Sequence, residues 1–191
     1  MSMDLDAAAK AVEALLVALG HPPDSDPELA ETGRRVAEAM QEDLLAGYAI
    51  DAAAVLSEST AATRPGLVVV SDVAALVMSP HPLQPALGSA HIAYWPGDRL
   101  VGLGALARLV DCFGRRLALQ EVVAQQVADA RVTHLGARAS VCMLDLAPTC
   151  VQARGERQAR ARAVSVALAG SDDPELRRTM LARLPSPRGP A

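Results

Sequence analysis

The fold is decided by the stretch from Ala90 to Glu121, which reads AHIAYWPGDRLVGLGALARLVDCFGRRLALQE. Its first part, His91 to Trp95, alternates in the way typical of a β-strand, and the Pro-Gly-Asp that follows at residues 96–98 predicts a turn. Apolar residues then recur at the spacing of one helix face, at positions 103, 106, 110, 113 and 117. The stretch therefore predicts a strand, a turn and a helix with one buried face.

Composition limits the classes to which the protein can belong. Its 191 residues suffice for one ordinary domain, and its formal net charge of −4 lacks the basic excess typical of nucleic-acid-binding proteins. Because no apolar run approaches about 20 residues, we expect no membrane span. Cys112, Cys142 and Cys150 have no paired spacing, and the N-terminus lacks the pattern of a signal peptide. Both features predict a cytoplasmic protein.

The rest of the chain predicts an α+β fold. Asp26-Pro27 and Asp173-Pro174 each combine a capping Asp with Pro at the first helical position, so each begins a helix. Strands that follow one another in pairs predict an antiparallel sheet with helices on one face, preceded by N-terminal helices. The expected helices cover residues 4–19, 26–48, 103–117, 120–135 and 173–184, and the expected strands cover residues 67–77, 89–95, 138–146, 151–155 and 161–168. A proline-rich loop is expected at residues 78–85.

Three motifs in this order resemble the GTP cyclohydrolase I family. His91 to Pro96 match its H-I-A-Y-x-P strand and turn, Gly102 to Arg108 match its G-L-S-K-L-A-R segment, and Gln120-Glu121 match the end of its Q-V-Q-E segment. The resemblance implies the tunnelling fold, whose subunits join their sheets into a barrel, so we expect a homo-oligomer (a pentamer or a decamer). It divides the chain into an N-terminal helical region (1–65), a tunnelling-fold domain (66–184) and a disordered tail (185–191).

The zinc site that the resemblance implies is incomplete. In the family, zinc is held by the Cys and the last His of a C-E-H-H motif and by a later Cys. That motif falls on residues 79–82, where Ser79 and Pro82 replace two ligands, and Cys150 keeps the third position. A copper site of Met78, His81 and Cys150 is an alternative, but Met78 fits a packed core better. We therefore expect no metal and no cofactor, with zinc as the less favoured alternative.

The residues that handle protons in the family are partly kept. His81 matches the first His of the C-E-H-H motif, whereas a second catalytic His is replaced by Pro148. Cys150 begins a match to the family's C-x-x-x-R-G motif and could serve as a nucleophile or an acid. We predict His81, Cys150 and Glu121 as catalytic residues. An exposed loop residue is the alternative for His81, and a plain buried thiol is the alternative for Cys150.

The residues that bind the ligand in the family are better kept. Glu121 matches a carboxylate that pairs with the N–H and amino groups of guanine, and Gln120 matches its neighbour in that pocket. Arg108 and Arg154 match two triphosphate-binding residues, whereas Ala105 replaces a lysine of that site. The expected partner is a small heterocycle of the purine or pterin type. A helix-dipole role for Glu121 and a solvated helix face for Arg108 are the alternatives.

These observations predict a diverged GTP cyclohydrolase I-like enzyme that works without a metal. We expect acid–base chemistry, such as a ring closure, a dehydration or a rearrangement, in a specialised biosynthetic pathway. The alternative is a non-catalytic paralogue that binds a purine or pterin, or a regulatory subunit. A third and less favoured hypothesis is the conversion of GTP to dihydroneopterin triphosphate with a rebuilt zinc site.

Overall fold

An antiparallel sheet lies at the centre of the computed structural model, which describes residues 3–63, 66–155 and 157–187. Its strands follow the order β2-β3-β5-β6 and are β2 (Val68–Met78), β3 (Pro85–Trp95), β5 (Ala139–Pro148) and β6 (Ala163–Gly170). A separate pair joins β1 (Ser59–Ala61) to β4 (Arg99–Val101). The predicted α+β class with an antiparallel sheet is confirmed.

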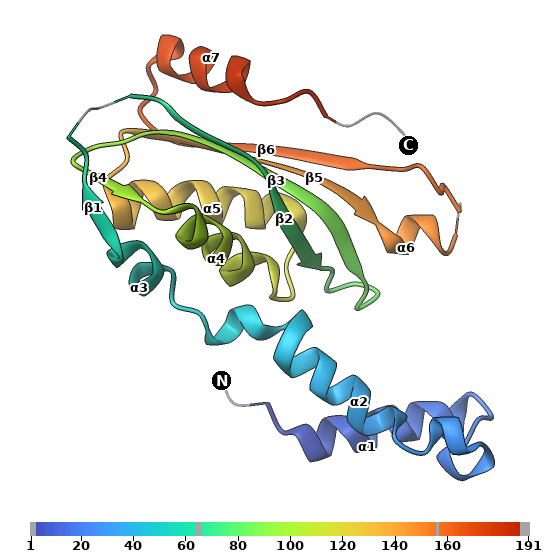
Figure 1. The fold of residues 1–191 in the computed structure, drawn as a ribbon. Coiled ribbons are helices and arrows are strands. Elements are labelled where there is room, and N and C mark those ends of the chain that lie inside the picture. The colour runs from blue at the N-terminus through green and yellow to red at the C-terminus, as the bar shows by residue number, and fades with distance from the viewer. Residues whose placement is uncertain (1–2, 64–65, 156, 188–191) are drawn as a thin grey trace.

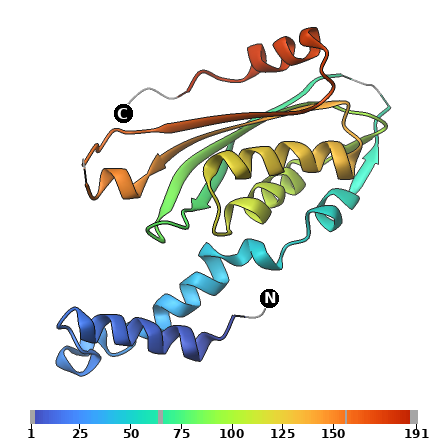
Figure 2. The ribbon, with the colours of Figure 1, turned by 180° about the vertical axis from the view of Figure 1, so that it is seen from behind.

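Two helices cover one face of this sheet, as Figures 1 and 2 show. They are α4 (Leu103–Gly114) and α5 (Gln120–Leu135), and the short α3 (Ala52–Ser57) packs against both. The main hydrophobic core fills the space between the sheet and the helices and includes the fully buried Tyr94, Leu106 and Leu144. Burying side chains of this size contributes roughly 1.5–3 kcal/mol each, so this layer anchors the fold.

The last helix, α7 (Pro174–Arg183), lies on the opposite face of the sheet. Its Met180 is fully buried and packs with Ala93, Ala139 and Val141, which are the residues of β3 and β5 that point away from α4 and α5. The alternation of a β-strand therefore gives each central strand a buried side chain on both faces. This second cluster explains why β5 reads as an almost continuous apolar run.

A bulge in β2 is held by a histidine of β3. The pairing register shifts between Val70 and Val73, and Asp72 has a positive φ of 59° there. The backbone N–H of Asp72 donates a hydrogen bond to Nδ1 of His91, 3.2 Å away, and the His91 side chain is buried. The imidazole of the H-I-A-Y motif thus fixes the bend of the neighbouring strand.

The N-terminal region differs from its prediction. A single helix over residues 26–48 is wrong, because the chain is broken into shorter turns: α2 (Thr32–Ala39) is followed by a π-helical turn and by a 3₁₀ turn, and a further 3₁₀ turn precedes it. The first helix, α1 (Leu5–Ala18), agrees with expectation and is capped by the side chain of Asp4. Helical turns therefore occur within residues 26–48, but they are interrupted.

Two close backbone contacts explain the interruptions. A Cβ at Gly33 would lie 2.8 Å from the carbonyl oxygen of Ala9, so only glycine lets α2 approach α1 this closely. A Cβ at Gly47 would lie 2.6 Å from the carbonyl oxygen of Asp111 in α4. The chain around Gly47 therefore follows the shape required by docking onto α4 and not that of a continuous helix.

Arg116 fastens this N-terminal segment to the end of α4. Its guanidinium donates to the carbonyl oxygens of Gly47 and Ile50, each at 3.0 Å, and lies 5.7 Å and 5.4 Å from the ring centres of Tyr48 and Phe113. Cation–π contacts of this kind add to the hydrogen bonds. The same cation therefore determines where the N-terminal helices leave the body of the protein.

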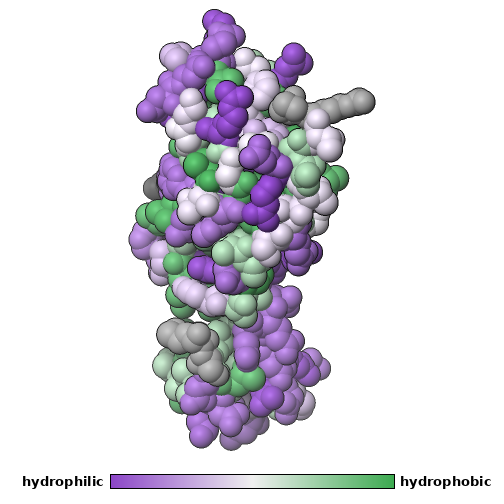
Figure 3. Space-filling view, turned by 90° about the vertical axis from the view of Figure 1, so that its left-hand side faces the viewer, coloured by the Kyte–Doolittle hydropathy of each residue, from purple (hydrophilic) through white to green (hydrophobic). Residues whose placement is uncertain are grey.

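The N-terminal helices project from the body (Figure 1). In the view of Figure 3, this lower part of the molecule is mainly hydrophilic. Leu15 and Val17 of α1 and the following Leu19 are each exposed by more than half of their surface, and Ala9 is the buried residue of α1. No helix in the described part of the chain is long and apolar enough to span a membrane.

Two further predictions concern the C-terminal third. The strand expected at 151–155 is wrong, because residues there belong to the short helix α6 (Thr149–Gln152) and its exit. The hydroxyl of Thr149 donates to the carbonyl oxygen of Pro85 at 2.6 Å, which turns the chain away from the sheet. The domain boundary expected at residue 65 and most of the expected disordered tail lie outside the described residues, so both stay predictions.

A buried arginine and a buried thiol face each other between α5 and β5. Arg131 donates to the Ser140 hydroxyl at 2.7 Å and to the Val141 carbonyl at 2.9 Å. Burial lowers the pKa of Arg131 to about 10 and raises the pKa of the Cys142 thiol to about 11. At neutral pH the interior therefore holds a cation next to a neutral thiol.

The Cys142 thiol makes the stability depend on pH at alkaline values. Between about pH 9 and pH 11 the unfolded chain loses the thiol proton while the folded chain keeps it, so the free energy of unfolding falls as pH rises. The loss expected from this residue by pH 10 is on the order of 1 kcal/mol. Denaturant unfolding at pH 8, 9 and 10 measures it, and Cys142→Ala is expected to fall less steeply than the wild type. Equal slopes for the two proteins would contradict this origin.

Candidate functional site

A small pocket lies at one end of the sheet, where three parts of the chain meet. Its volume is about 160 Å³. The β2–β3 turn supplies Ser79 and Gln84, the start of α5 supplies Gln120 and Glu121, and the exit of β5 supplies Pro148 and Cys150; the remaining lining residues are Val77, Pro85, Ala86, Ala118 and Leu119. Residues up to 73 positions apart in sequence thereby form one candidate site.

Backbone hydrogen bonds fix the walls of this pocket. The N–H of Ala118 donates to the carbonyl of Met78 at 3.1 Å, which joins the α4–α5 connection to the end of β2. The N–H of Ser79 donates to the carbonyl of Gln84 at 3.1 Å and closes the β2–β3 turn. Ala86 pairs with Pro148 in the sheet register. Each wall is therefore continuous with a strand of the central sheet.

Gln120 and Glu121 lie side by side at the start of α5 but have different environments. The side-chain amide of Gln120 donates to the carbonyl oxygens of Leu144 at 3.1 Å and of Ala163 at 2.9 Å, so it holds α5 against β5 and β6. Glu121 is exposed, and its carboxylate is in the first turn of the helix. The helix dipole favours a carboxylate at this position. Gln120 therefore orients the first turn of α5, which places Glu121 at the pocket.

Cys150 is the thiol of the pocket and is half-buried. The other pocket residues at the positions of the family's metal and proton-handling groups are Ser79, a weak zinc donor, and Pro148, which has no side-chain donor. Among residues 3–63, 66–155 and 157–187, no three His, Cys, Asp or Glu side chains are grouped closely enough to hold a metal ion. The donors that this chain brings to the pocket do not fit the zinc site implied by the resemblance.

The structure leaves His81 outside this group. The residue is exposed in the β2–β3 turn, its backbone N–H lies 3.4 Å from the Ser79 hydroxyl, and its side chain is not part of the pocket lining. His81 is three residues from Gln84, which does line the pocket. Its catalytic role stays a prediction, and it would require the turn or a ligand to bring the imidazole closer.

The two arginines expected to bind phosphate also lie outside the pocket lining. Arg108 is on α4, and its guanidinium pairs with the Glu58 carboxylate at 2.5 Å, where both side chains are exposed. Arg154 is exposed after α6. A ligand that used Arg108 would have to compete with Glu58, and exposed ion pairs of this kind contribute only about 0–1 kcal/mol. Both assignments therefore stay predictions.

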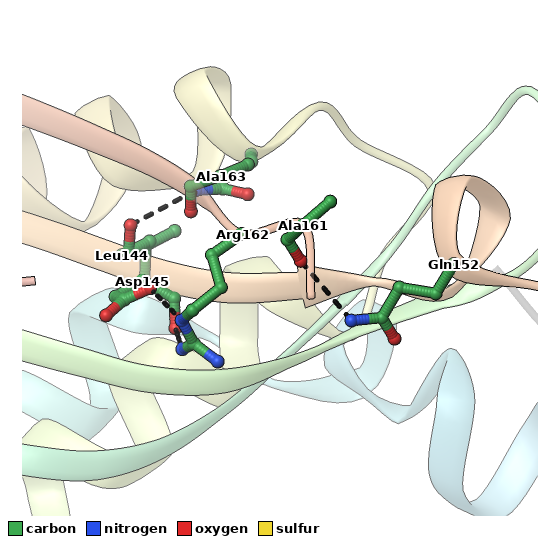
Figure 4. A network of polar contacts seen from close by, with 7 residues as sticks. Leu144, Asp145, Gln152, Ala161, Arg162 and Ala163 are labelled. Atoms are coloured by element: carbon green, nitrogen blue, oxygen red, sulfur yellow. Dashed lines mark hydrogen bonds and ion pairs between the residues drawn. The ribbon is translucent and has the colours of Figure 1, made fainter. Parts of the chain in front are cut away.

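A second polar group joins β5 to the segment that leads into β6 (Figure 4). Arg162 donates through Nε to the Asp145 carboxylate at 2.7 Å and through Nη2 to the Asp145 carbonyl at 2.9 Å. The Asp145 side chain is only 1% exposed. Gln152 of α6 donates to the carbonyl of Ala161 at 3.3 Å. These bonds fix the chain that leads into β6 and thus the carbonyl of Ala163 that Gln120 uses.

Sequence reasoning missed one residue of the pocket. Gln84 belongs to none of the matched motifs, and its neighbours Leu83 and Pro85 mark only a turn. Its side-chain Oε1 is buried, with no hydrogen-bond partner among the described residues. Only the folded structure places Gln84 at the pocket, because its position depends on the turn between β2 and β3 and not on a periodic pattern in the sequence.

The fold and the pocket define the class of protein: an α+β domain with a four-stranded antiparallel sheet, two helices on one face and a candidate site at the strand ends. Comparison with known proteins gives the family. The model of the family described as GTP cyclohydrolase I matches residues 8–184. The chain belongs to the GTP cyclohydrolase I family, and the predicted resemblance and the tunnelling fold are confirmed.

Two relatives agree in sequence with this assignment. The chain is 35% identical over 160 residues to "GTP cyclohydrolase 1" of Ralstonia nicotianae, covering 84% of this chain and 76% of that protein. It is 37% identical over 164 residues to "GTP cyclohydrolase 1" of Thermobifida fusca, covering 85% and 78%. A solved structure, the apo form of the archaeosine synthase QueF-Like, aligns with a TM-score of 0.47 and 14% identity over 57% of this chain and 98% of that one.

Proposed function

We propose that this protein is a diverged enzyme of the GTP cyclohydrolase I family that binds a purine- or pterin-like heterocycle and acts on it without a metal. The observation that carries the proposal is the pocket in which Glu121 and Cys150 meet while Ser79 and Pro148 occupy the positions of a metal ligand and a catalytic histidine. The relatives are named for GTP cyclohydrolase activity, and the retained carboxylate supports a related ligand.

The pocket favours a ligand with hydrogen-bond donors. A carboxylate such as Glu121 accepts two parallel bonds from a ring N–H and an adjacent amino group, which guanine and pterins both present. Among the pocket's lining residues Glu121 is the charged side chain, and the others are neutral. A neutral heterocycle with adjacent donors therefore fits this lining better than an anionic ring does.

The reaction that suits these groups is proton transfer. Cys150 is a half-buried thiol at the pocket and can give or take a proton or attack an electrophilic carbon. Glu121 would orient the heterocycle, and His81, which is exposed in the β2–β3 turn, would act only if a bound ligand drew it inward. A ring closure, a dehydration or a rearrangement needs no more than these roles.

An oligomer would complete the site. The outer edges of β2 and β6 pair with no strand among the described residues, and β6 exposes Val164 and Val166. Open strand edges favour pairing with another copy, and α1 exposes a row of apolar side chains that a second copy would cover. We propose a homo-oligomer, a pentamer or a decamer of the tunnelling type, in the cytoplasm.

The second candidate function is a non-catalytic binding protein or regulatory subunit. The exposed position of His81 and the Arg108–Glu58 ion pair favour it, because both remove family groups from the pocket. The experiment that separates the two incubates the purified protein with GTP, guanosine, neopterin and 7,8-dihydroneopterin and follows binding by calorimetry and products by mass spectrometry. A new product supports the enzyme, and binding without any product supports the binding protein. If neither binding nor a product is detected, both hypotheses are refuted.

A further inference from the structure

A second cavity lies where the N-terminal segment meets the body of the protein. Its volume is about 260 Å³, which is larger than that of the candidate pocket. The π-helical turn (Met40–Leu44) and the 3₁₀ turn (Ala46–Ala49) meet the α4–α5 connection here. The lining residues of this N-terminal cavity are Met3, Gln41, Leu45, Ala46, Tyr48, Ala49 and Leu117. None of them lines the candidate pocket, so the two sites are separate.

The lining of the N-terminal cavity favours an aromatic molecule. Tyr48 is 46% exposed, so a ligand can reach its ring. The Arg116 guanidinium holds that ring from 5.7 Å and is not itself part of the lining. A pair of aromatic rings contributes about 0.5–1.5 kcal/mol beyond the area that it buries. Pockets for drug-sized molecules measure roughly 300–1,000 Å³, so this cavity suits a smaller molecule of one or two rings.

Charge selects the second group of the ligand. Residues 1–63 contain 12 Asp or Glu and three Lys or Arg, which gives this part of the chain a net charge of −9. Two of these acids adjoin lining residues in sequence, because Asp4 follows Met3 and Glu42 follows Gln41, and both acids are exposed. This field favours a protonated amine and disfavours a carboxylate or a phosphate.

We propose that the N-terminal cavity binds a small aromatic amine, a molecule of one or two rings with a protonated amino group. The ring packs against Tyr48 and Leu117, and the ammonium group faces the carboxylates of Asp4 and Glu42. This ligand differs from the heterocycle proposed for the candidate pocket, and its binding does not depend on that proposal.

The N-terminal cavity and the candidate pocket share one stretch of backbone. Leu117 lines the cavity, whereas Ala118 and Leu119 line the pocket. The N–H of Leu117 donates to Tyr48 Oη at 3.3 Å, and the N–H of Ala118 donates to the Met78 carbonyl at 3.1 Å. A ligand that holds Tyr48 and Leu117 therefore restrains the chain that leads into the first turn of α5. This connection makes the cavity an effector site for the pocket.

The first test measures the affinity of the full chain for 2-phenylethylamine and tryptamine by calorimetry and ligand-observed NMR. At least one of these amines is expected to bind with a Kd below about 1 mM. We expect 3-phenylpropanoate, which carries a carboxylate, and butylamine, which lacks a ring, to bind at least about 10-fold more weakly. No binding of either aromatic amine up to about 5 mM would overturn the proposal, and equal binding of either comparison compound would overturn the ligand class.

Variants of the lining locate the bound amine. Ala49→Phe fills the cavity from an exposed position and is expected to weaken binding at least about 10-fold. Ala54→Phe is the matched control, because Ala54 is exposed on α3 and is not part of the lining. Tyr48→Leu keeps an apolar side chain without the ring and is expected to weaken binding about 3- to 10-fold. An amine that binds Ala49→Phe as tightly as the wild type would lie elsewhere, which would overturn the proposed site.

Hydrogen exchange tests the effector role. The bound amine is expected to slow the exchange of the backbone amides of residues 118–122 in the wild type and not in Ala49→Phe. Unchanged exchange in the wild type with the amine bound would overturn the effector role. These measurements use neither a nucleotide nor a product, so a failure here is distinguishable from a failure of the proposed function.

Discussion

Replacing Glu121 by Gln is expected to weaken the binding of GTP or a pterin probe about 100-fold. The carboxylate would lose its charge, and one of its two acceptor oxygens would become a donor that faces the ligand's own donors. Each charge-assisted hydrogen bond contributes about 1.5–3 kcal/mol, so the loss of one bond and the weakening of the other amounts to roughly 3 kcal/mol. Isothermal titration calorimetry measures the change directly.

The exposed position of Glu121 makes this variant easy to interpret. The side chain lies on the surface of the first turn of α5, so its structural contribution is limited to the helix dipole, about 0.3–1 kcal/mol. Glu42→Gln is the matched control, because Glu42 is exposed in the π-helical turn of the N-terminal region, away from the pocket lining. Both variants should fold as the wild type does, and only Glu121→Gln should lose the ligand.

A pair of nucleotides tests the geometry of the contact. ITP differs from GTP by the absence of the amino group that a carboxylate would engage together with the ring N–H. The wild type is expected to prefer GTP by about 10-fold, the value of roughly one hydrogen bond, and Glu121→Gln is expected to lose this preference. A wild type that binds ITP as tightly as GTP would place the contact elsewhere.

Arg162→Ala is expected to cost the protein about 3 kcal/mol of its free energy of unfolding. The substitution removes a guanidinium from the Asp145 carboxylate, which is 1% exposed and lies 2.7 Å from Arg162 Nε. Removing one partner of a buried ion pair costs about 3–5 kcal/mol, and the partial exposure of Arg162 places this pair at the lower end. Urea unfolding measures the loss.

Two further variants separate the ion pair from other effects. Arg160→Ala removes a nearby exposed arginine and should change the stability by less than about 0.5 kcal/mol. The double variant Asp145→Ala/Arg162→Ala should recover part of the free energy of unfolding that Arg162→Ala loses. With both side chains removed, no unpaired carboxylate is left buried. If the double variant is as unstable as the sum of the two single variants, the pair does not act as a unit.

Arg162→Ala is also expected to affect the pocket at the start of α5. Arg162 and Gln152 hold the segment that enters β6, and Ala163 in that segment accepts the hydrogen bond that orients Gln120 beside Glu121. Loosening β6 should therefore also loosen the first turn of α5.

Where local pattern and tertiary packing agree, the sequence was sufficient to predict the structure. Helix α5 was expected at residues 120–135 and is found there, because its buried residues recur with helical spacing and Gly136 ends it in a left-handed conformation. The N-terminal helix at 26–48 was predicted too long, since Gly33 and Gly47 owe their positions to contacts with α1 and α4. Contacts of that kind leave no periodic trace in the sequence.

The candidate site was predictable to a similar degree. The motifs singled out Glu121, Gln120 and Cys150, and these three residues line one pocket, whereas their roles stay predictions. The exposure of His81 agrees with the exposed-loop alternative, whereas the pairing of Arg108 with Glu58 was not predictable, because a partner 50 residues away depends on the complete fold. Gln84 was missed for the same reason.

The central claim is that this pocket binds its ligand through Glu121 and without a metal. The measurement that tests it most directly is the zinc content per subunit, by elemental analysis of protein purified without chelators or a histidine tag, together with ligand binding in the same sample. We predict far less than one zinc per subunit and ligand binding that chelators leave unchanged. One zinc per subunit, with binding or turnover lost on its removal, would contradict the account and return metal-assisted hydrolysis as the function.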